Sequence, residues 1–519
     1  MVKTLRSNGS GDLLQLFTNC APAPARTQFR RRAASKFGEM PSLTSWLPPG
    51  GAAIFATYFL YVMLNTCGGA LLPAIIVQVG FSDGEAATIA GVQTLAQALG
   101  KLTVAGWLAD TLGGRRCYAL TMLCTAGATL GYAFGQTAVA VGAAAFCVEF
   151  CSTPSYPAHV HFVRNRFDST RAPTSSGARV AAHGGSGTGG ATAGVDRTGD
   201  GFWLLGLASR MGDVTSKLGY GAALAALGGA AAYRSVVFGG AALGVGAALL
   251  GLACHREPAK APEAAAAGGG GASLWSGALR SADFRLGAAA LGSVCAVKRT
   301  GELLLGVYFA ATAAEGLCDA ACGMKLAATW SAGVACSVLL GGRAFNAAVC
   351  VRTKLRLAAA LNATSALAAL ALALLSRQRA ATAGQLDLRA ALVFVAAAGI
   401  GLSYYIPAGL FAVAFGGARA GTVSAHLDAL SFGLSSAVLV ALRFVLDSPS
   451  ALGGWAGVWL VLAALQAAAT VLVHRFLRAT LCGDVRPLLD SACSGTAGSE
   501  EEERAGLLAE AAVMEVEVS

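Results

Sequence analysis

The chain has 519 residues, of which 55% are hydrophobic and only 13% are charged. A soluble protein carries about 25% charged residues, so one water-soluble core cannot hide this much apolar surface. The formal charge is +10, but its cations do not gather on one element with interleaved aromatic residues, which argues against nucleic-acid binding. The fourteen cysteines lie mostly in apolar runs and show no zinc-ligand spacing. Neither a nucleophile–base arrangement nor a nucleotide loop is present, so we expect no enzyme and no cofactor.

Apolar segments long enough to cross a bilayer begin at about residue 51, after a polar and basic N-terminal stretch. A bilayer needs about 20 residues per helix, and every backbone polar group inside it needs an internal partner. The sequence therefore predicts twelve helical spans and contact with a lipid bilayer. The predicted spans are 52–79, 86–109, 116–136, 138–163, 202–227, 232–254, 286–313, 321–345, 354–376, 388–416, 421–446 and 451–479.

Lysine and arginine alternate between the two sides of the predicted spans. They follow spans two, four, six, eight and twelve, whereas the loops after spans one, three and eleven hold none. The positive-inside rule therefore predicts that both termini are cytosolic. The loop after span nine is the exception, because it carries Arg377, Arg379 and Arg389. Glu503 with Leu507 and Leu508 fits an acidic dileucine sorting pattern, which favours a vacuolar, lysosomal or plasma membrane over a plastid one; a plain solvated acidic tail is the alternative.

Two long polar connections suggest a division of the chain into two halves. "GWLAD" at Gly106 and "GRAFN" at Gly342 each end the second span of a half, which is the weak internal symmetry of duplicated transporters. We expect a monomer. The predicted parts are a cytosolic tail (1–50), an N-terminal six-helix bundle (51–254) with a flexible cytosolic loop (164–201), a cytosolic linker (255–284), a C-terminal six-helix bundle (285–480) and an acidic cytosolic tail (481–519).

The stretch "GWLADTLGGRR" falls in the short turn between spans two and three. Its glycine allows close helix approach, and its aspartate can accept hydrogen bonds from the amides at a helix N-terminus. The stretch resembles the signature loop of the major facilitator superfamily, G-x-L-a-D-r-x-G-r-[RK]. This resemblance implies an all-α membrane protein of twelve helices in two pseudo-symmetric six-helix bundles, working by alternating access. The candidate gating residues are Gly106, Asp110, Gly113, Arg115 and Arg116.

Three further stretches are similar to the organophosphate:phosphate antiporter branch of that superfamily. "LGKLTVAGWLAD" places Lys101 five residues before the motif glycine, "VKRTGELLLGVYF" places Arg299 or Lys298 at a basic site of span seven, and "YPAHVHFVRNRF" matches the exit of span four. The resemblance implies a phosphate ester exchanged for inorganic phosphate. The branch has an arginine in span one, where this chain has Asn65 and Thr66.

Charged residues deep in the predicted spans are the candidate substrate site, since each costs at least about 2.5–3.5 kcal/mol to place there. Arg210, Asp213 and Lys217 share one face of span five, and Lys298 and Glu302 are spaced for a local pair. The cations exceed the acids by one, which favours an anion. Structural ion pairing is the alternative for each. The candidate substrate contacts are Lys101, Arg210, Arg299, Lys298, Asn65, Tyr404 and Tyr405, and the candidate proton carriers are Glu149, Asp213, Glu302 and Asp428.

These patterns predict a secondary transporter of a small anionic solute. A phosphate ester exchanged for phosphate is the expected cargo. A proton-coupled carrier of an organic anion such as a carboxylate is the first alternative, and a non-transporting sensor or scaffold with the same fold is the second.

Overall fold

The computed structural model describes residues 51–167, 198–255, 278–416, 420–448, 453–483 and 485. The chain divides into two units after Ala52, and the described residues lie almost entirely in the second. The predicted N-terminal tail and acidic tail with its dileucine pattern lie outside the described residues, as do most of the predicted loop 164–201 and of the linker 255–284.

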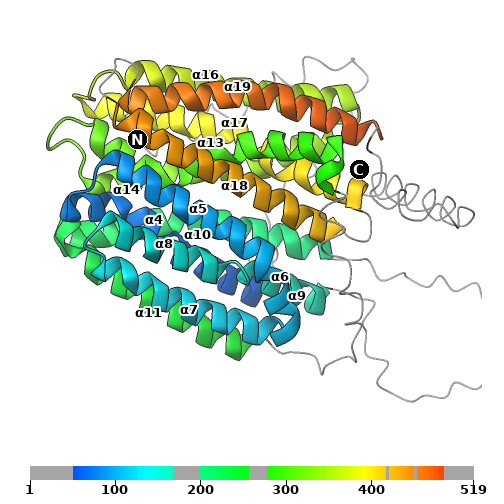
Figure 1. The fold of residues 1–519 in the computed structure, drawn as a ribbon, viewed down its shortest axis with the longest axis horizontal. Coiled ribbons are helices and arrows are strands. Elements are labelled where there is room, and N and C mark those ends of the chain that lie inside the picture. The colour runs from blue at the N-terminus through cyan, green and yellow to red at the C-terminus, as the bar shows by residue number, and fades with distance from the viewer. Residues whose placement is uncertain are drawn as a thin grey trace, which may run out of the picture. The chain divides into compact units, whose positions relative to one another are not determined.

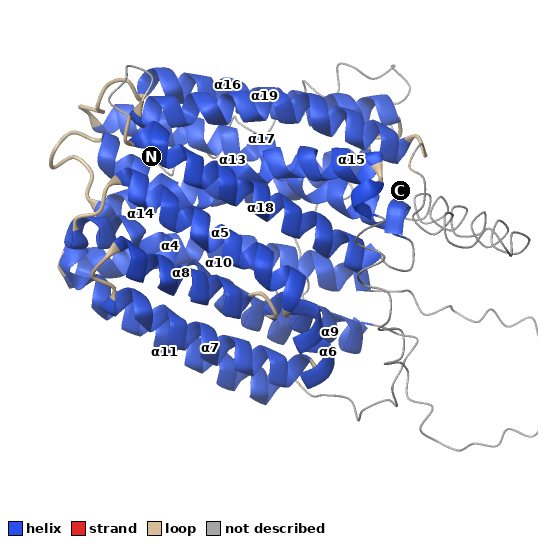
Figure 2. Ribbon diagram, in the orientation of Figure 1, coloured by secondary structure: helices blue, strands red, loops and turns tan. Residues whose placement is uncertain are grey.

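Helices account for nearly all of the described chain (Figures 1 and 2). The only extended pairing in the described ranges is an isolated bridge between Ala313 and Ala380. The first half comprises α4 (Gly51–Val79), α5 (Asp83–Thr103), α6 (Ala105–Leu112), α7 (Gly114–Phe134), α8 (Ala138–Ser152), α9 (Ser155–Phe167), α10 (Thr198–Leu227), η2 (Gly229–Ala232) and α11 (Tyr233–Cys254). The second comprises α13 (Ala282–Thr312), α14 (Ala320–Cys336), η3 (Ser337–Gly341), α15 (Gly342–Ala347), α16 (Val351–Leu375), α17 (Ala383–Gly416), α18 (Ala420–Leu446) and α19 (Gly454–Leu481).

Nine helical segments among the described residues are long and apolar enough to cross a membrane. The three other predicted spans correspond to α5, α10 and α13, which are 21, 30 and 31 residues long. These three helices carry most of the deep charges that the sequence places in a candidate site, and the charges lower their hydropathy. The helices with the most polar composition therefore carry most of the candidate site.

Two predicted spans are interrupted where the sequence suggested continuous helices. The segment 86–109 is split into α5 and α6 at Val104, two residues before Gly106, and glycine is a weak helix former. The segment 138–163 is split into α8 and α9 next to Pro154, because proline has no amide hydrogen to donate within a helix. Both breaks lie near the side at which α4 begins and α19 ends, which we call the tail side; the opposite side is the far side.

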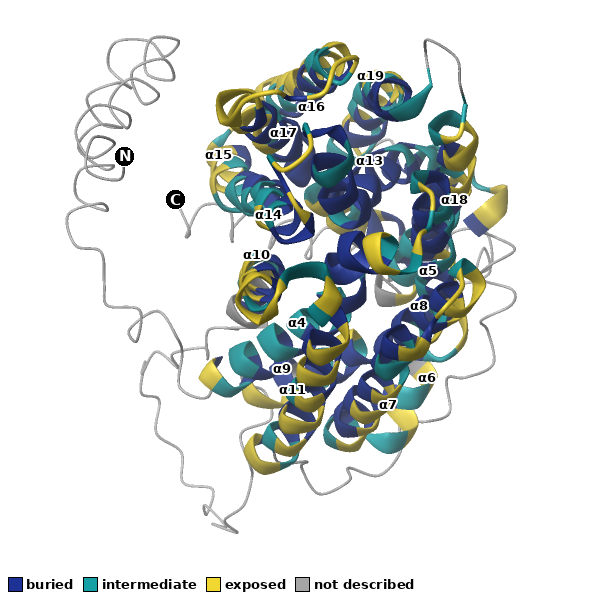
Figure 3. Cartoon of the chain, turned by 90° about the vertical axis from the view of Figure 1, so that its left-hand side faces the viewer, coloured by how far each residue is buried: buried dark blue, intermediate teal, exposed yellow. Residues whose placement is uncertain are grey.

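The two halves meet along two helix pairs. Helix α5 packs against α18, and α10 packs against α14, while α7 with α11 and α16 with α19 pack within their own halves. In Figure 1, α7 and α11 lie at one edge and α16 and α19 at the opposite edge. Figure 3 shows buried residues on the facing sides of the helices and exposed ones on outer faces such as those of α11 and α16. Large apolar side chains such as Leu249 and Leu367 are exposed there, as lipid contact requires.

Close contacts between the halves fill the far-side part of the interface. A Cβ on Gly91 of α5 would lie 2.6 Å from Cγ2 of Val440 on α18, so only glycine fits there. The Ser436 hydroxyl donates to the Gly91 carbonyl at 2.8 Å, and the Trp455 indole of α19 donates to Asp83 at the start of α5 at 2.8 Å. These contacts close the space between the halves on the far side.

Two histidines share one buried hydroxyl at the tail-side end of the first half. Thr57 Oγ1 lies 3.2 Å from Nε2 of His159 and 3.1 Å from Nε2 of His255, and all three side chains are buried. Burial, with a smaller effect of Arg115, lowers the pKa of His255 to about 4, so this imidazole is neutral near pH 7. The cluster ties α4 to α9 and to the end of α11. His159 thus packs in the interior, whereas His161 pairs with Asp110.

Candidate substrate-binding site

A cavity of about 560 Å³ lies between the two halves. Its lining comes from the tail-side parts of several helices, for example residues 58–69 of α4, which begins at Gly51, and residues 404–409 of α17, which ends at Gly416. Because the far side is closed, the cavity lies toward the tail side. Every predicted substrate contact and every predicted proton carrier lies in the lining: Asn65, Lys101, Arg210, Lys298, Arg299, Tyr404 and Tyr405, with Glu149, Asp213, Glu302 and Asp428.

Glu149 of α8 is the most deeply buried charge of the cavity, with 1% of its side chain exposed. It accepts hydrogen bonds from the amide of Gln93 at 2.8 Å, from the amide of Asn65 at 3.3 Å and from the Arg299 guanidinium at 3.3 Å. The carboxylate is thus bound by one cation and two neutral donors from three other helices.

Glu302 of α13 gathers three cations around one carboxylate. Lys298 approaches it to 2.7 Å, Arg299 to 3.2 Å and Arg210 of α10 to 3.4 Å. Arg299 therefore bridges Glu302 and Glu149, and Arg210 links the two halves. The sequence left open whether Lys298 or Arg299 faces the cavity; in the structure both line it.

Lys101 of α5 pairs with Asp428 of α18 at 2.6 Å, across the boundary between the halves. About a quarter of the lysine side chain and a third of the aspartate side chain are exposed. The Lys101 ammonium also lies 4.4 Å from the centre of the Phe432 ring, a cation–π contact.

Lys217 of α10 lies behind the cavity wall rather than in its lining. Its ammonium contacts Asp213 at 3.2 Å and the Ser331 hydroxyl of α14 at 2.8 Å, and only 2% of its side chain is exposed. On this face Lys217 therefore pairs with Asp213, and Arg210, the second cation, contacts Glu302 of α13.

The one-charge excess of cations over acids that the sequence suggested is present once Lys217 is counted behind the wall, because Lys217 neutralises Asp213 of the lining. The described lining of the cavity holds four cations and four carboxylates, since Lys217 is excluded from it. Each cation of the lining is within ion-pair distance of one of these carboxylates. With Lys217 behind the wall, the nine groups carry a formal charge of +1 when all are ionised, but each cation of the lining already contacts a carboxylate.

Aromatic side chains supply much of the remaining lining. Tyr58 and Tyr61 of α4 lie with ring centres 5.4 Å apart, and Tyr404 and Tyr405 of α17 form an edge-to-face pair at 4.8 Å. The Lys298 ammonium lies 4.7 Å from the Tyr404 ring centre. The sequence analysis missed Tyr58, Tyr61 and also Gln93, whose helical positions give no signal without knowledge of which face turns inward.

The predicted gating motif forms the tail-side turn between α6 and α7. Gly113 adopts φ +77° there, a backbone conformation that favours glycine, which explains the second glycine of the motif. Asp110 lies on the surface and accepts a hydrogen bond from His161 Nε2 at 3.2 Å. Its observed partner is thus an imidazole of α9, not the helix-terminal amides that the sequence analysis expected. Gly106, Arg115 and Arg116 lie in the same turn region, and their gating role stays a prediction.

No family profile and no curated protein matches the sequence. Solved structures do resemble the fold. A point mutant of the nucleoside transporter NupG matches with a TM-score of 0.63 at 12% identity, over 82% of this chain and 99% of that chain. A bacterial homologue of the human lysosomal transporter Spinster matches at 0.56 and 12% identity, over 84% and 98%. The peptide transporter POT in complex with sulfate matches at 0.55 and 16% identity, over 83% and 96%.

The chain has the fold of these transporters. The predicted all-α membrane-protein fold is thereby confirmed, and nine helical segments of the described residues are long and apolar enough to cross a membrane. Identities of this size show the fold alone. The resemblance to the organophosphate:phosphate antiporter branch stays a prediction.

Proposed function

We propose that the chain is a secondary transporter that moves a small organic anion together with a proton by alternating access. Support comes from the fold and from a cavity between the halves that is closed on the far side by the Gly91–Ser436 and Asp83–Trp455 contacts. Binding near the middle of the membrane at the interface of two repeats is the arrangement that alternating access uses. The structure corresponds to the state that loads or releases solute on the tail side.

The observation that carries the proposal is that every cation of the described cavity lining already contacts a carboxylate. An anion that enters must approach the carboxylates that already occupy the cations. Two like charges 4 Å apart repel by about 4 kcal/mol at an effective dielectric constant near 20. That repulsion corresponds to about a thousandfold in affinity. Protonation of one carboxylate removes this repulsion, frees a cation for the anion and offsets the negative charge that the anion brings.

Glu149 is the carboxylate that we assign to the proton. Its protonation gives up contact with one cation, whereas protonation of Glu302 gives up contact with three. Arg299 would keep Glu302 as its counter-charge and would present its freed edge to the anion. Asn65 suits both states of Glu149, because its amide group donates to a carboxylate and, after a half-turn, accepts from a carboxylic acid. Its Oδ1 atom has no hydrogen-bond partner in the described residues.

Exchange of a phosphate ester for inorganic phosphate, as the sequence resemblance implies, has weaker support. A dianion needs at least two cations released from their carboxylates, and span one offers Asn65 where the antiporter branch has arginine. We therefore place the proton-coupled organic anion ahead of it. A sensor or scaffold would show no flux of either kind.

Uptake into liposomes separates these functions. Purified protein is reconstituted, and labelled gluconate, a monocarboxylate, or glucose 6-phosphate is offered with an inward proton gradient or with internal phosphate. We expect the gradient to drive carboxylate uptake without internal phosphate, and a protonophore to abolish it. Protein-free liposomes give the leak. Uptake that needs internal phosphate and ignores the gradient would support the antiporter instead.

We also propose that the tail side faces the cytosol. Besides the pattern of lysine and arginine, a far-side disulfide joins Cys318 of the loop before α14 to Cys322 in the first turn of α14, whereas Cys254, Cys350 and Cys482 are free and exposed on the tail side. Disulfides persist in oxidising compartments and free thiols in the cytosol. The membrane itself stays open between a vacuolar, lysosomal and plasma membrane.

Thiol labelling of intact vesicles tests this orientation. In sealed vesicles whose non-cytosolic face is outward, an impermeant maleimide should react with Cys322 in a Cys318→Ser variant but reach Cys350 only after permeabilisation. The wild-type chain, whose far-side thiols are paired, is the control. Labelling of Cys350 in sealed vesicles, with Cys322 protected, would reverse the assignment.

A further inference from the structure

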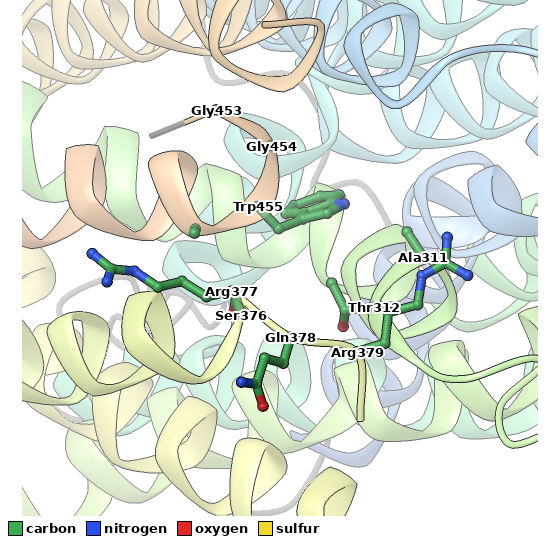
Figure 4. A pocket seen from close by; sticks show the side chains of 10 residues that line it. Ala311, Thr312, Ser376, Arg377, Gln378, Arg379, Gly453, Gly454 and Trp455 are labelled. Carbon is green, nitrogen blue, oxygen red and sulfur yellow. The ribbon is translucent and has the colours of Figure 1, made fainter. Parts of the chain in front are cut away.

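A second cavity, of about 550 Å³, opens on the far side and belongs to neither the substrate site nor its network (Figure 4). It lies where the loop between α16 and α17 meets the end of α13 and the start of α19. Its lining residues are Ala311, Thr312, Ser376, Arg377, Gln378, Arg379, Gly453, Gly454, Trp455 and Ala456. This is the loop whose arginines depart from the positive-inside pattern.

A buried arginine builds the wall of this cavity. Arg389 of α17 is 3% exposed and donates to the backbone carbonyls of Thr312 at 3.2 Å, Leu375 at 2.6 Å and Gln378 at 2.6 Å. The bridge between Ala313 and Ala380 fixes the same loop from its other end. Arg389 thus has a structural role, which explains one of the three arginines that depart from the positive-inside pattern.

The other two arginines remain available to a ligand. Arg377 and Arg379 are exposed, and neither has an ion-pair partner in the described part of the chain. Figure 4 shows their side chains extending in opposite directions from the loop, with Trp455 above the stretch between them. None of the described residues that line the cavity is acidic. Gly453 and Gly454 begin the 28-residue helix α19, whose first amides have no side-chain cap and whose dipole favours an anion.

The cavity also touches the contact that closes the far side. Trp455 lines it, packs on Tyr308 at 5.4 Å between ring centres and donates to Asp83 of the other half at 2.8 Å. Tyr308 is in turn 2.9 Å from the hydroxyl of Ser376 in the cavity wall. A ligand here therefore contacts a residue whose partner must separate from it when the far side opens.

We infer that this cavity is a binding site for a phosphate-bearing group, which lies beside the start of α19 with Arg377 on one side and Arg379 on the other. The chemistry is shared by the headgroup of an anionic lipid in the far leaflet and by a small soluble phosphate. A ligand that prefers the Trp455–Asp83 contact intact stabilises the far-closed state, because binding shifts an equilibrium by its difference in affinity for the two states. The inference concerns binding alone and stands apart from the proposed proton coupling.

The test measures binding to the full chain in nanodiscs of phosphatidylcholine. One arm adds phosphatidylglycerol and counts retained lipids by native mass spectrometry; the other titrates soluble glycerol 3-phosphate and follows protein thermal stability. The variant is Arg377→Gln/Arg379→Gln, and the control is Arg356→Gln, an exposed arginine on the tail side. Loss of two charge-assisted hydrogen bonds should weaken binding by at least about tenfold in the double variant.

Selective retention of phosphatidylglycerol that falls in the double variant but not in the control supports a lipid site. The same pattern with glycerol 3-phosphate alone supports a soluble ligand. Equal binding by wild type, double variant and control in both arms overturns the inference, as does equal retention of phosphatidylcholine and phosphatidylglycerol without any response to glycerol 3-phosphate.

Discussion

Glu149→Gln is expected to abolish proton-driven accumulation of the anion while leaving exchange of the anion across the membrane intact. Glutamine keeps the shape of a protonated glutamate and its bonds to Asn65 and Gln93, but it cannot release a proton. The Arg299 edge that faced Glu149 becomes available to the anion at any pH. Anion binding at pH 7.5 should strengthen by at least about tenfold, within the roughly 4 kcal/mol that one like-charge repulsion represents.

Two assays on the same proteoliposomes separate the outcomes for Glu149. Accumulation under an imposed proton gradient should fall to the level of protein-free liposomes, and exchange at equal pH on both sides should persist. Glu315→Gln removes an exposed far-side carboxylate and should behave as wild type. If the Glu149 variant still concentrates the anion when the gradient is imposed, another group carries the proton.

Lys217→Met is expected to produce the largest loss of stability among single changes outside the cavity lining. The ammonium is the ion-pair partner of Asp213 at 3.2 Å and also donates to Ser331 across the boundary between the halves. Removing one member of a buried pair leaves the other charge uncompensated, at a cost of about 3–5 kcal/mol. The physical cause is the desolvated Asp213 carboxylate, not the packing volume of the lysine chain.

Thermal unfolding in detergent measures this effect, with Lys325→Met, an exposed lysine of α14, as the matched control. The double variant Asp213→Asn/Lys217→Met removes both charges and should recover most of the lost stability. Equal unfolding temperatures for Lys217→Met and the control would show that Asp213 and Lys217 do not depend on each other.

The fold was predictable because its signals are local. Apolar runs and the boundaries between them place each helix within a few residues. The motif glycine at Gly113 is explained by its positive φ, which favours glycine. The breaks near Val104 and Pro154 are also local, and Pro154 was visible in the sequence. What composition alone obscured was that α5, α10 and α13, the least apolar helices, are the ones that carry the site.

The site was predictable in its residues but not in its pairings. Buried charges are costly, so charged residues deep in apolar runs could be predicted as site residues from the sequence. All the predicted contacts lie in the cavity lining. Which cation meets which acid depends on how α10 faces α13 and how α5 faces α18, and no spacing within one helix contains that information. The Lys298–Glu302 pair lies within one helix and was foreseen; the Lys101–Asp428 pair joins residues of the two halves and was not.

The proton movement that accompanies anion entry tests the central claim most directly. Liposomes containing the protein and a pH-sensitive dye receive external gluconate, a monoanion, with no initial pH difference, and the internal pH is recorded. Coupled entry predicts internal acidification that grows with gluconate concentration and disappears in Glu149→Gln. Gluconate uptake that leaves the internal pH unchanged would contradict the account, because the cavity would then be admitting an anion without its proton.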